Sequence, residues 1–382
     1  MKKVALIASV ASMIKQFNMN NINILIDLGC SITIISNFSE PGSISIAEAK
    51  KFMCELNHRG IKTYDIGFKR SPFSFGNLKS YNHVKRINSI ENFDIIHCQS
   101  PVGGVIGRLV KKKNQKVIYT AHGFHFYKKS PKKNWIIFFP IEKLLSYKTN
   151  VLLTINSEDF NLSEKKLNAK KNIQIPGIGI DIKQFSNLEK AEKKDFGFSN
   201  SDFLLVYGAE LNNNKNQIIL INMMEKISKI DNKIKLLLVG QGENHDKLME
   251  IVKNKNLEDI VYLMGYRNDL NLIISVCDIA VASSIREGLG MFVLEAMYLG
   301  LPAVVSNNRG HRTIVQPQIN GFLFDLNGGV EPIIEAVFEL KNDKTLYKMF
   351  SDNSKKISEN FSDQCTNIIM RSVYFGLLNE TE

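Results

Sequence analysis

The 382-residue sequence predicts an α/β protein with two domains, each built on a doubly wound parallel sheet. Three observations lead to this fold class. Short apolar runs rich in β-branched residues alternate with longer amphipathic stretches along the chain. Most of these runs are continuously apolar, which is typical of parallel strands buried on both faces. The chain is also long enough for two domains of ordinary size.

Six apolar runs predict strands in each half of the chain. Those of the first half are Val4–Ser9, Ser31–Ser36, Thr63–Ile66, Phe93–Cys98, Val117–Thr120 and Val151–Ile155. Those of the second half are Phe203–Tyr207, Ile234–Val239, Ile260–Met264, Asp278–Ala282, Ala303–Ser306 and Phe322–Phe324. The stretches between them predict helices, for instance Ile46–Arg59, Lys79–Glu91, Lys215–Ile230 and His245–Asn254.

The pattern breaks near the midpoint of the chain, where Pro176, Gly177 and Gly179 interrupt the periodicity. We therefore expect a first domain over residues 1–180 and a second over 181–362. The stretch from Asp363 to Leu378 predicts a helix, and we expect residues 363–382 to cross back onto the first domain.

The N-terminus imitates a secretory signal, with a basic start, a short apolar stretch and small residues up to Ser12. We interpret it as a first buried strand, because the apolar run is short and the chain continues towards a second strand. No uncharged apolar run approaches the ~20 residues of a membrane-spanning helix. The five cysteines are scattered and without metal spacing, which indicates reduced core residues of a cytosolic protein: Cys30, Cys54, Cys98, Cys277 and Cys365.

The net charge of +11 is unevenly distributed. Residues 1–182 hold 27 basic and 12 acidic residues, a net charge of +15, whereas the remainder carries −4. Lysine clusters at 111–113 and at Lys128, Lys129, Lys132 and Lys133 could face anionic lipid or a pyrophosphate-bearing acceptor. The Lys, Asn and Ile content also fits an AT-rich genome, which would explain some of the lysine but not its asymmetry.

The segment EGLGMFVLE, from Glu287 to Glu295, is the most informative part of the sequence. Gly288 and Gly290 leave backbone N–H groups accessible where a helix begins at about Met291, and such helix starts bind phosphate. Ionised carboxylates suit paired hydroxyls, so Glu287 is a candidate for a sugar and Glu295 for a ribose. The alternative is a solvated loop carboxylate and a second one favoured by the helix dipole.

Further segments resemble a known family when they are taken in order with this glutamate pair. They are HCQSPVGGV at 97–105, YTAHGFHFY at 119–127, NW at 134–135 followed by PIEK at 140–143, TINSED at 154–159 and PGIGID at 176–181. The sequence resembles, over essentially its whole length, the family 4 retaining glycosyltransferases of the GT-B fold, and especially the bacterial capsular and exopolysaccharide enzymes. The resemblance implies two Rossmann-like domains facing across a cleft, the first binding the acceptor and the second the nucleotide sugar.

The resemblance also implies roles for residues of the second half. Glu295 matches the carboxylate that holds the ribose hydroxyls, Glu287 the one that contacts the transferred sugar, and Lys215 the diphosphate-binding lysine. The remaining candidates for the donor are the backbone around Gly288, Leu289, Gly290 and Met291, the base-reading segment 265–267 with Arg267, and Asn216. Cations and amide dipoles suit this place because a departing diphosphate gathers negative charge. Alone, Lys215 would be read as a surface lysine at a helix start.

One position departs from the family pattern. Many relatives carry Gly-Arg where this chain has Ala209-Glu210, and that arginine joins the lysine on the diphosphate. Arg286 or Arg309 could supply the missing positive charge, although Arg286 also reads as a solvated loop residue. Glu210 could contact a sugar hydroxyl or stabilise Lys215.

His122 is the main candidate of the first half. It follows a predicted strand in a Gly-containing loop, where α/β folds bind ligands. The resemblance implies that it faces the transferred sugar, and we predict an orienting or hydrogen-bonding role. His122 and His125 are three residues apart, a spacing that suits zinc only on a helix, and no further ligand cluster is present. For His125 and His97 a structural role is the expectation.

Two segments leave alternatives open. Gly103-Gly104 could let an acceptor phosphate approach the backbone, or could pack a helix start tightly against the sheet. The run WIIFF at 135–139, beside the lysines at 128–133, could lie on a membrane or belong to the core.

The resemblance implies retaining transfer, in which the diphosphate leaves from the face that the acceptor hydroxyl attacks and its oxygen can take the proton. A glycoside hydrolase needs two acids flanking one bond, whereas a helix places Glu295 roughly 8–10 Å from the sugar end. No Asp-x-Asp motif is present, so neither a metal nor another cofactor is expected.

We therefore expect transfer from a nucleotide sugar, UDP-linked by first choice, to a hydroxyl of a lipid-linked saccharide. The expected location is the cytoplasm, with peripheral contact to anionic lipid on the inner face of the plasma membrane, and no nucleic-acid partner. Two rivals remain. A UDP-sugar epimerase of the same architecture would turn over without an acceptor, and a non-catalytic basic binding protein would bind with strong salt dependence and tolerate Glu287→Ala.

Overall fold

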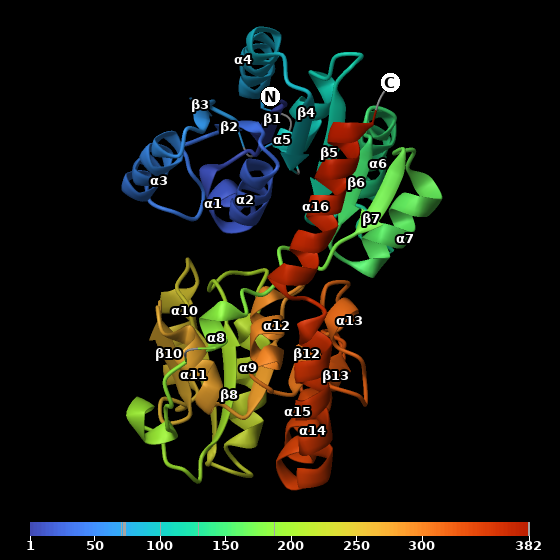
Figure 1. Ribbon diagram of the computed structural model, residues 1–382. Helices are drawn as coiled ribbons and strands as arrows, with labels where there is room; N and C mark the ends of the chain where they lie inside the picture. The colour runs from blue at the N-terminus through green and yellow to red at the C-terminus, as the bar shows by residue number, and fades with distance from the viewer. Residues whose placement is uncertain (70, 72–73, 100, 129, 187, 381–382) are drawn as a thin grey trace. The chain divides into compact units, whose positions relative to one another are not determined.

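The computed structural model describes residues 1–69, 71, 74–99, 101–128, 130–186 and 188–380, so Ser100 and Lys129 of the sequence motifs lie outside the described residues. The chain forms two compact units (Figure 1). The first comprises Met1–Gly179 together with Asp363–Glu382, and the second comprises Ile180–Ser362.

The first unit is built on a seven-stranded parallel sheet with the order β3-β2-β1-β4-β5-β6-β7. Its strands are β1 (Lys3–Ile7), β2 (Ser31–Ser36), β3 (Lys62–Asp65), β4 (Ile95–Gln99), β5 (Lys116–Ala121), β6 (Val151–Thr154) and β7 (Lys171–Gln174). The central strand β4 is buried at every position, as expected for a strand covered on both faces.

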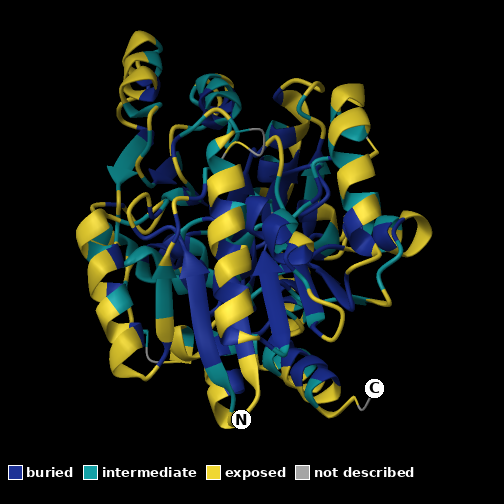
Figure 2. Ribbon diagram, turned by 90° about the horizontal axis from the view of Figure 1, so that it is seen from above, coloured by how far each residue is buried: buried dark blue, intermediate teal, exposed yellow. Residues whose placement is uncertain are grey.

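The helices of the first unit cover both faces of this sheet, and Figure 2 shows buried strands beneath helices whose outward faces are exposed. They are α1 (Ala11–Phe17), α2 (Met19–Asp27), α3 (Ile46–His58), α4 (Gly76–Glu91), α5 (Val102–Leu109), α6 (Lys132–Ser146), α7 (Ser157–Lys166) and α16 (Asp363–Asn379). Helix α16 packs on α2, and its buried Tyr374 hydroxyl is hydrogen-bonded to Nδ1 of His97 in β4 at 2.6 Å.

The second unit has a six-stranded parallel sheet with the order β10-β9-β8-β11-β12-β13. Its strands are β8 (Phe203–Gly208), β9 (Ile234–Val239), β10 (Val261–Gly265), β11 (Ile279–Ala282), β12 (Ala303–Ser306) and β13 (Gly321–Phe324). Its helices are α8 (Lys183–Ser186), a 3-10 turn at Lys193–Phe196, α9 (Gln217–Ile227), α10 (His245–Asn254), α11 (Leu270–Val276), α12 (Met291–Tyr298), α13 (His311–Ile314), α14 (Glu331–Asn342) and α15 (Lys344–Glu359).

Each sheet reverses its strand order once. The reversal falls between β1 and β4 in the first unit and between β8 and β11 in the second. In open α/β sheets, ligands bind outside the carboxyl ends of the strands at such a switch point. The loops that follow β8 and β11 are therefore the candidate ligand site of the second unit.

The structure corrects the sequence reading at several positions. It adds β7, whose residues are exposed or only half-buried and so lack the apolar signal of a buried strand. It starts α9 at Gln217 rather than at Lys215, because Asn216 adopts a left-handed backbone with φ 53°. Of the five cysteines only Cys98 and Cys277 are buried, and Cys54 is exposed, so most are not core residues.

The glycine pair after Pro101 packs against the sheet. A Cβ at Gly103 would lie 3.1 Å from Cα of Ala8 in the loop after β1, and one at Gly104 would lie 2.4 Å from Cε2 of Tyr119 in β5. Both positions require glycine for this close packing alone. The geometry favours the packing role over an approach by an acceptor phosphate.

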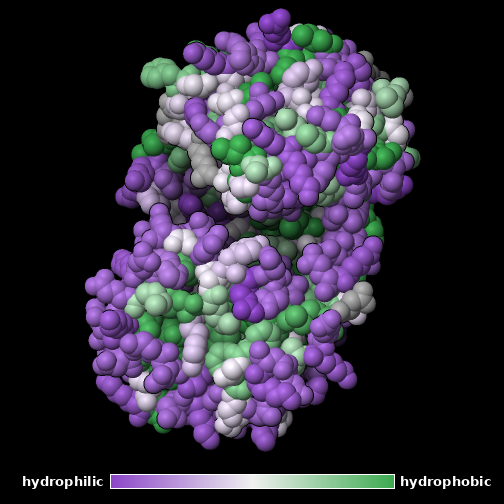
Figure 3. Space-filling model, turned by 90° about the vertical axis from the view of Figure 1, so that its left-hand side faces the viewer, coloured by the Kyte–Doolittle hydropathy of each residue, from purple (hydrophilic) through white to green (hydrophobic). Residues whose placement is uncertain are grey.

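Within the described ranges, no helix is both long and apolar enough to cross a membrane. The face of the molecule seen in Figure 3 carries mostly hydrophilic side chains, with hydrophobic ones in small scattered groups.

Candidate functional site

Two loops at the carboxyl end of the second sheet are joined to each other by hydrogen bonds. They are the loop 209–216 after β8 and the loop 283–290 after β11. The backbone N–H of Ile285 donates to the carbonyl of Asn214 at 2.7 Å, and Nδ2 of Asn214 donates to the carbonyl of Arg286 at 3.0 Å. The Ser283 hydroxyl donates to the carbonyl of Lys215 at 2.9 Å. These contacts hold Lys215 beside the loop that carries Glu287.

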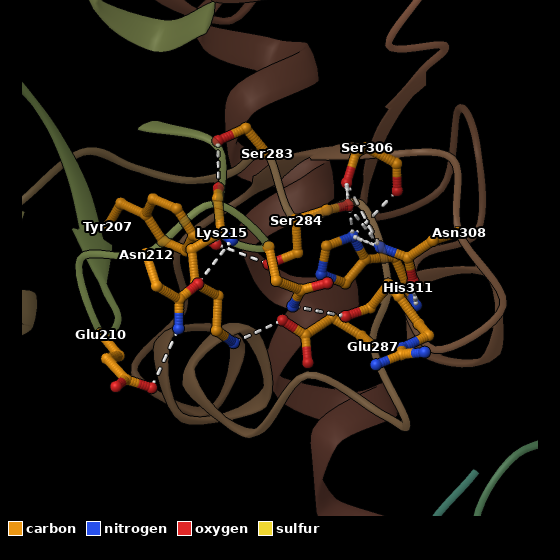
Figure 4. A network of polar contacts seen from close by, with 12 residues as sticks. Tyr207, Glu210, Asn212, Lys215, Ser283, Ser284, Glu287, Ser306, Asn308 and His311 are labelled. Atoms are coloured by element: carbon orange, nitrogen blue, oxygen red, sulfur yellow. Dashed lines mark hydrogen bonds and ion pairs between the residues drawn. The ribbon is translucent and has the colours of Figure 1, made fainter. Parts of the chain in front are cut away.

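Lys215 and Glu287 form an ion pair, with 2.5 Å between Nζ and Oε1 (Figure 4). Their side chains are only 25% and 16% exposed. Burial alone would raise the pKa of Glu287, but the ammonium group of Lys215 and a hydrogen bond from Ser284 bring that pKa below its ordinary value. Glu287 is therefore an ionised hydrogen-bond acceptor at neutral pH.

Tyr207 and Ser284 form a chain of hydrogen bonds that ends at the Glu287 carboxylate. The Tyr207 hydroxyl is hydrogen-bonded to Oγ of Ser284 at 2.6 Å, and Ser284 is in turn hydrogen-bonded to Glu287. Both side chains are buried, and burial raises the pKa of Tyr207 well above its ordinary range. The sequence reasoning missed both residues, although each lies at or near the carboxyl end of a predicted strand.

The glycine turn after Glu287 opens α12 without a side-chain cap. Gly290 is the N-cap residue, with φ 103°, a left-handed conformation that favours glycine. The buried Leu289 anchors the turn between Gly288 and Gly290. A Cβ at Gly310 would lie 2.8 Å from Cβ of Glu287 and 2.9 Å from the backbone N of Leu289, so the loop after β12 packs directly on this turn. Backbone N–H groups at such a helix start, from Met291 onwards, suit an anionic ligand.

Glu295 lies on the next turn of α12 and differs from Glu287 in its protonation. Burial raises the pKa of Glu295 to about 7, and within the described part of the chain no cation forms an ion pair with it. The sequence reasoning treated both glutamates as ionised acceptors. The structure separates them into an ionised Glu287 and a Glu295 that titrates near neutral pH.

His311 is a third residue that the sequence reasoning missed. Its Nδ1 donates to the carbonyl of Ser306 at 2.8 Å, and its backbone N–H donates to Oδ1 of Asn308 at 3.1 Å. Burial lowers the pKa of His311 to about 4 despite the nearby Glu287, so the ring is neutral with its proton on Nδ1. A Cβ at Gly290 would lie 3.0 Å from Cδ2 of His311, which places the ring under the glycine turn. The signal in the sequence was its position just after a predicted strand, in the same loop as Arg309.

Glu210 stands where many relatives have an arginine, and the two arginines that could replace that charge differ in their exposure. Glu210 is exposed, and it accepts from Nδ2 of Asn212 at 2.9 Å while Oδ1 of Asn212 accepts from the backbone N–H of Lys215 at 3.0 Å. Glu210 is thus linked to the backbone of Lys215 and not to its ammonium group. Arg286 is exposed beside Glu287, whereas Arg309 is buried. Of the two arginines, Arg286 is the one that solvent and a ligand can reach.

Two other residues predicted to bind the nucleotide sugar form hydrogen bonds within the protein. Arg267 donates to both carboxylate oxygens of Asp269, at 2.7 and 2.5 Å, just after β10. The carbonyl of Asn216 accepts from the Ser283 hydroxyl at 3.0 Å. The structure thus brings Lys215, Asn216, Arg286, Glu287 and the glycine turn together, while Arg267 follows a different strand of the same sheet.

His122 lies in the first unit, directly after β5. Its Nε2 donates to Oε1 of Gln99, whose own Nε2 donates to Oδ1 of Asn18 at 2.5 Å. The orientation of the Gln99 amide therefore places the proton of the neutral ring on Nε2. Burial lowers the pKa of His122 to about 4, so the ring is neutral at pH 7. His97 is buried between Tyr374 and Thr120, and the ring of His125 stacks on Phe138 at 4.6 Å.

Replacing Gln99 with glutamate is expected to make His122 a cation at mildly acidic pH. The new carboxylate would favour the charged ring and raise the pKa of His122 from about 4 into the range of roughly 5–7. The NMR titration of the imidazole C–H signals measures this shift, with the buried His97 as a reference that stays neutral. A His122 signal that still titrates near 4 would contradict the contact with Gln99.

Over the residues that the structure describes, no group of three or more His, Cys, Asp or Glu side chains is placed to hold a metal ion.

Two family models match the two units of the chain. Residues 189–357 match the model of group 1 glycosyl transferases, and residues 3–156 match that of the glycosyl transferase 4-like proteins. Together the two models span most of the sequence and include the loops that carry Lys215, Glu287 and His122.

Three relatives extend the likeness along the chain. The EpsD protein of Bacillus subtilis (strain 168), which is named as a glycosyltransferase, is 36% identical over 326 residues, 83% of this chain and 85% of that protein. The UDP-Gal:α-D-GlcNAc-diphosphoundecaprenol α-1,3-galactosyltransferase of Escherichia coli is 28% identical over 75% of this chain and 76% of its own length. The capsular polysaccharide biosynthesis glycosyltransferase CapM of Staphylococcus aureus is 25% identical over 84% and 88%.

The fold is shared with solved glycosyltransferase structures. The crystal structure of Anabaena Alr3699/HepE in complex with UDP and glucose superposes with a TM-score of 0.74 over 98% of this chain and 100% of that one, at 16% sequence identity. The sequence matches, the two parallel sheets and the likeness to HepE all indicate the same family and fold. The chain therefore belongs to family 4 of the glycosyltransferases, and it is a GT-B glycosyltransferase of polysaccharide biosynthesis.

Proposed function

We propose that the protein transfers a sugar from a UDP-sugar to a hydroxyl of a lipid-linked saccharide, with retention of the anomeric configuration. The observation that carries the proposal is the Lys215–Glu287 ion pair beside the uncapped start of α12, with Glu295 on the same helix. The Escherichia coli relative is named for a UDP-galactose donor and a lipid-linked acceptor, and the HepE structure holds UDP and glucose. The relative supports the choice of donor and acceptor class, and the HepE structure supports the choice of donor.

The donor would lie along the loop after β11. Its diphosphate would meet the N–H groups at the start of α12, together with the ammonium group of Lys215 and the guanidinium group of Arg286. Glu287 would accept hydrogen bonds from the transferred sugar, and Glu295 from the ribose. Lys215 would then change partner from the Glu287 carboxylate to the diphosphate, so that each member of the ion pair gains a ligand contact.

The proposed reaction balances without a further reagent. The bond between the anomeric carbon and the diphosphate oxygen breaks, the acceptor oxygen bonds to that carbon, and the hydroxyl proton passes to the leaving phosphate oxygen. Lys215, Arg286 and the α12 amides would stabilise the charge that collects on the diphosphate, which is why we propose a metal-independent reaction. His122 would orient a hydroxyl of the transferred sugar.

The two units would divide the substrates. We propose that residues 1–180 bind the acceptor and residues 181–362 the nucleotide sugar, with the final helix belonging to the acceptor domain. A lipid-linked acceptor places the reaction at a membrane, so we propose a cytoplasmic enzyme in peripheral contact with the inner face. Family membership favours this reading over the epimerase and over a binding protein without activity.

A thermal-shift panel of nucleotides tests the donor. UDP and UDP-sugars at 100 times their Kd should stabilise the protein by about 2.7 kcal/mol, which corresponds to several degrees in Tm for units of this size. GDP- and ADP-sugars at the same concentration serve as the controls and should leave Tm nearly unchanged. A shift with GDP- or ADP-sugars alone would overturn the choice of UDP.

A further inference from the structure

The junction between α1 and α2 is a single buried residue, Asn18. Its backbone N–H donates to the carbonyl of Ile14 at 3.0 Å, and its carbonyl accepts from the N–H of Ile22 at 2.9 Å. The backbone of Asn18 thus closes one helix and opens the next, and its carboxamide does not cap α2. Because Asn18 is completely buried, this carboxamide needs other hydrogen-bond partners.

The hydrogen bonds of the Asn18 carboxamide fix its direction. Nδ2 donates to the backbone carbonyl of Met13 at 3.1 Å. Oδ1 accepts from Nδ2 of Asn21 at 3.1 Å and from Nε2 of Gln99 at 2.5 Å. A backbone carbonyl can only accept, so half a turn of the Asn18 amide would set its oxygen against that carbonyl and its nitrogen against two donors. The backbone of α1 therefore determines that Asn18 presents an acceptor to Gln99.

Gln99 passes this direction on to the ring of His122. Gln99 is the last residue of β4 and is 2% exposed. Because its Nε2 donates to Asn18, its Oε1 is the atom that accepts from Nε2 of His122. The neutral ring then carries its proton on Nε2 and a lone pair on Nδ1. A group that approaches Nδ1 must donate a hydrogen bond, which suits a sugar hydroxyl.

The residue before Asn18 restrains the same ring by packing. The ring centroids of Phe17 and His122 lie 5.5 Å apart, with 49° between the ring planes. Two consecutive residues of the α1–α2 junction thus act on His122, one through contact and one through the Gln99 amide. His122 is partly exposed, whereas Asn18 and Gln99 are buried. A ligand can therefore reach the imidazole but not the two amides behind it.

We infer that Asn18, acting through Gln99, is a positioning residue that holds the ring of His122 in its Nε2–H form. The inference rests on the proposed role of His122 towards the transferred sugar only for its catalytic purpose, because the ring has this form without substrate. The alternative is that Asn18 only satisfies buried polar groups of α1 and α2. That alternative explains the contacts with Met13 and Asn21, but it predicts a ring that does not respond to the loss of Asn18.

The ¹⁵N signals of the imidazole nitrogens test the inference in the protein without ligand. The His122 signals of histidine-labelled protein are identified by their absence in His122→Gln. At pH 7 the wild type should show a protonated Nε2 and an unprotonated Nδ1. Asn18→Ala should shift the two signals towards each other, because a Gln99 amide without its acceptor can offer either end to the ring. Asn18→Asp presents an acceptor to Gln99 in either protonation state and should restore the wild-type signals.

The matched control is Asn88→Ala, which breaks another buried pair of amides in the first unit. Asn88 is 1% exposed and exchanges hydrogen bonds with Gln115 at 2.9 and 2.7 Å. Gln115 directly precedes β5, whereas His122 directly follows it, so the control lies at the opposite end of the sheet. Asn88→Ala should leave the His122 signals as they are in the wild type.

The rate of sugar transfer gives a second readout. Asn18→Ala should lower kcat/KM by up to about tenfold, the cost of one neutral hydrogen bond, while the affinity for UDP stays unchanged because UDP is proposed to bind the second unit. A wild type without transferase activity would contradict the proposed function, and the ring signals would still decide the inference.

Gln99→Leu replaces Asn18→Ala if the latter fails to fold by circular dichroism. It removes the acceptor of the Nε2 proton and should likewise give a mixture of the two ring forms. The inference is overturned if the wild-type proton is on Nδ1, if the folded variant of Asn18 or Gln99 keeps the wild-type signals, or if Asn88→Ala shifts them equally.

Discussion

Replacing Glu287 with glutamine is expected to lower kcat/KM for sugar transfer by about 100-fold or more, the usual cost of losing one preorganised electrostatic contact in an active site. The amide keeps the shape of the side chain but loses the charge that neutralises Lys215 and that, in the proposed function, accepts from a sugar hydroxyl. Initial rates of product formation, at saturating and at limiting donor, measure the change. The thermal unfolding midpoint, measured in parallel, separates a lost function from a lost fold.

The matched control is Asp231→Asn. Asp231 pairs with Lys341 at 2.6 Å, and the two side chains are 20% and 25% exposed, close to the values of the catalytic candidate pair. Asp231 lies between α9 and β9, at the end of the sheet opposite the loops that carry Lys215 and Glu287. Asp231→Asn should leave transfer unchanged. Equal activity in wild type and Glu287→Gln, or an equal loss in Asp231→Asn, would contradict the role of Glu287.

Replacing Glu295 with glutamine should weaken UDP binding at pH 8 and remove its dependence on pH. The ribose hydroxyls would donate to the ionised carboxylate, so the pKa of Glu295 should fall from about 7 when UDP binds. Wild-type affinity should therefore rise from pH 6 to pH 8, with release of a proton. Loss of a charge-assisted hydrogen bond costs about 1.5–3 kcal/mol, or roughly 10- to 150-fold in affinity.

Calorimetry in buffers of different ionisation enthalpy measures both the affinity and the proton release. Glu295→Asp retains a carboxylate on the same helix and should keep part of the pH dependence. A wild-type affinity that does not change between pH 6 and pH 8 would contradict the assignment of Glu295 to the ribose.

Glu295→Gln, which should weaken UDP binding, should increase the stability of the fold at pH 8. The folded-state pKa of Glu295, about 7, lies above the unfolded value of 4.5. Its contribution to stability is therefore fully present below pH 4.5 and is lost as the pH rises through 7. At pH 8 the buried carboxylate is charged, and Glu295→Gln should stabilise the protein by up to about 3 kcal/mol. Urea unfolding at pH 5 and pH 8 would show this gain, which a simple folding defect would not produce.

The central strands of both sheets could be predicted from the sequence because burial on both faces requires continuous apolar runs. Ser31–Ser36, Ile234–Val239 and Ala303–Ser306 have the same bounds in the sequence reading and in the structure. The edge strand β7 could not be found this way, because half-buried residues such as Asn172 leave no such run.

The pairing inside the candidate site depends on topology that a single sequence does not reveal. Lys215 and Glu287 are 72 positions apart and meet only because β8 and β11 are neighbours across the switch point. The sequence reasoning found Glu287 from the glycine turn before the helix and Lys215 through a family resemblance, but it did not pair them. It overlooked His311 because a position just after a predicted strand is a weak signal for a histidine without metal spacing, and the close approach to Gly290 is visible only in the structure.

In the run WIIFF at 135–139, the position of each residue around the helix determines whether it is buried or exposed. The sequence could place it either in the core or on a membrane. In α6 the residues Trp135, Phe138 and Phe139 face the core, while Ile136 and Ile137 face outward. The core reading thus applies to the three aromatic residues and not to the two isoleucines, because five consecutive helical positions cover all sides of a helix.

Transfer of labelled sugar from a UDP-sugar to a lipid-linked saccharide tests the central claim most directly. The account predicts that label reaches the lipid fraction, with release of UDP, only when protein and acceptor are both present, and that Glu287→Gln lowers kcat/KM for this transfer by about 100-fold or more. The contrary result is conversion of the UDP-sugar in the absence of any acceptor, or undiminished transfer by Glu287→Gln. Either outcome would contradict a transferase that binds its donor between Lys215 and the Glu287–Glu295 segment.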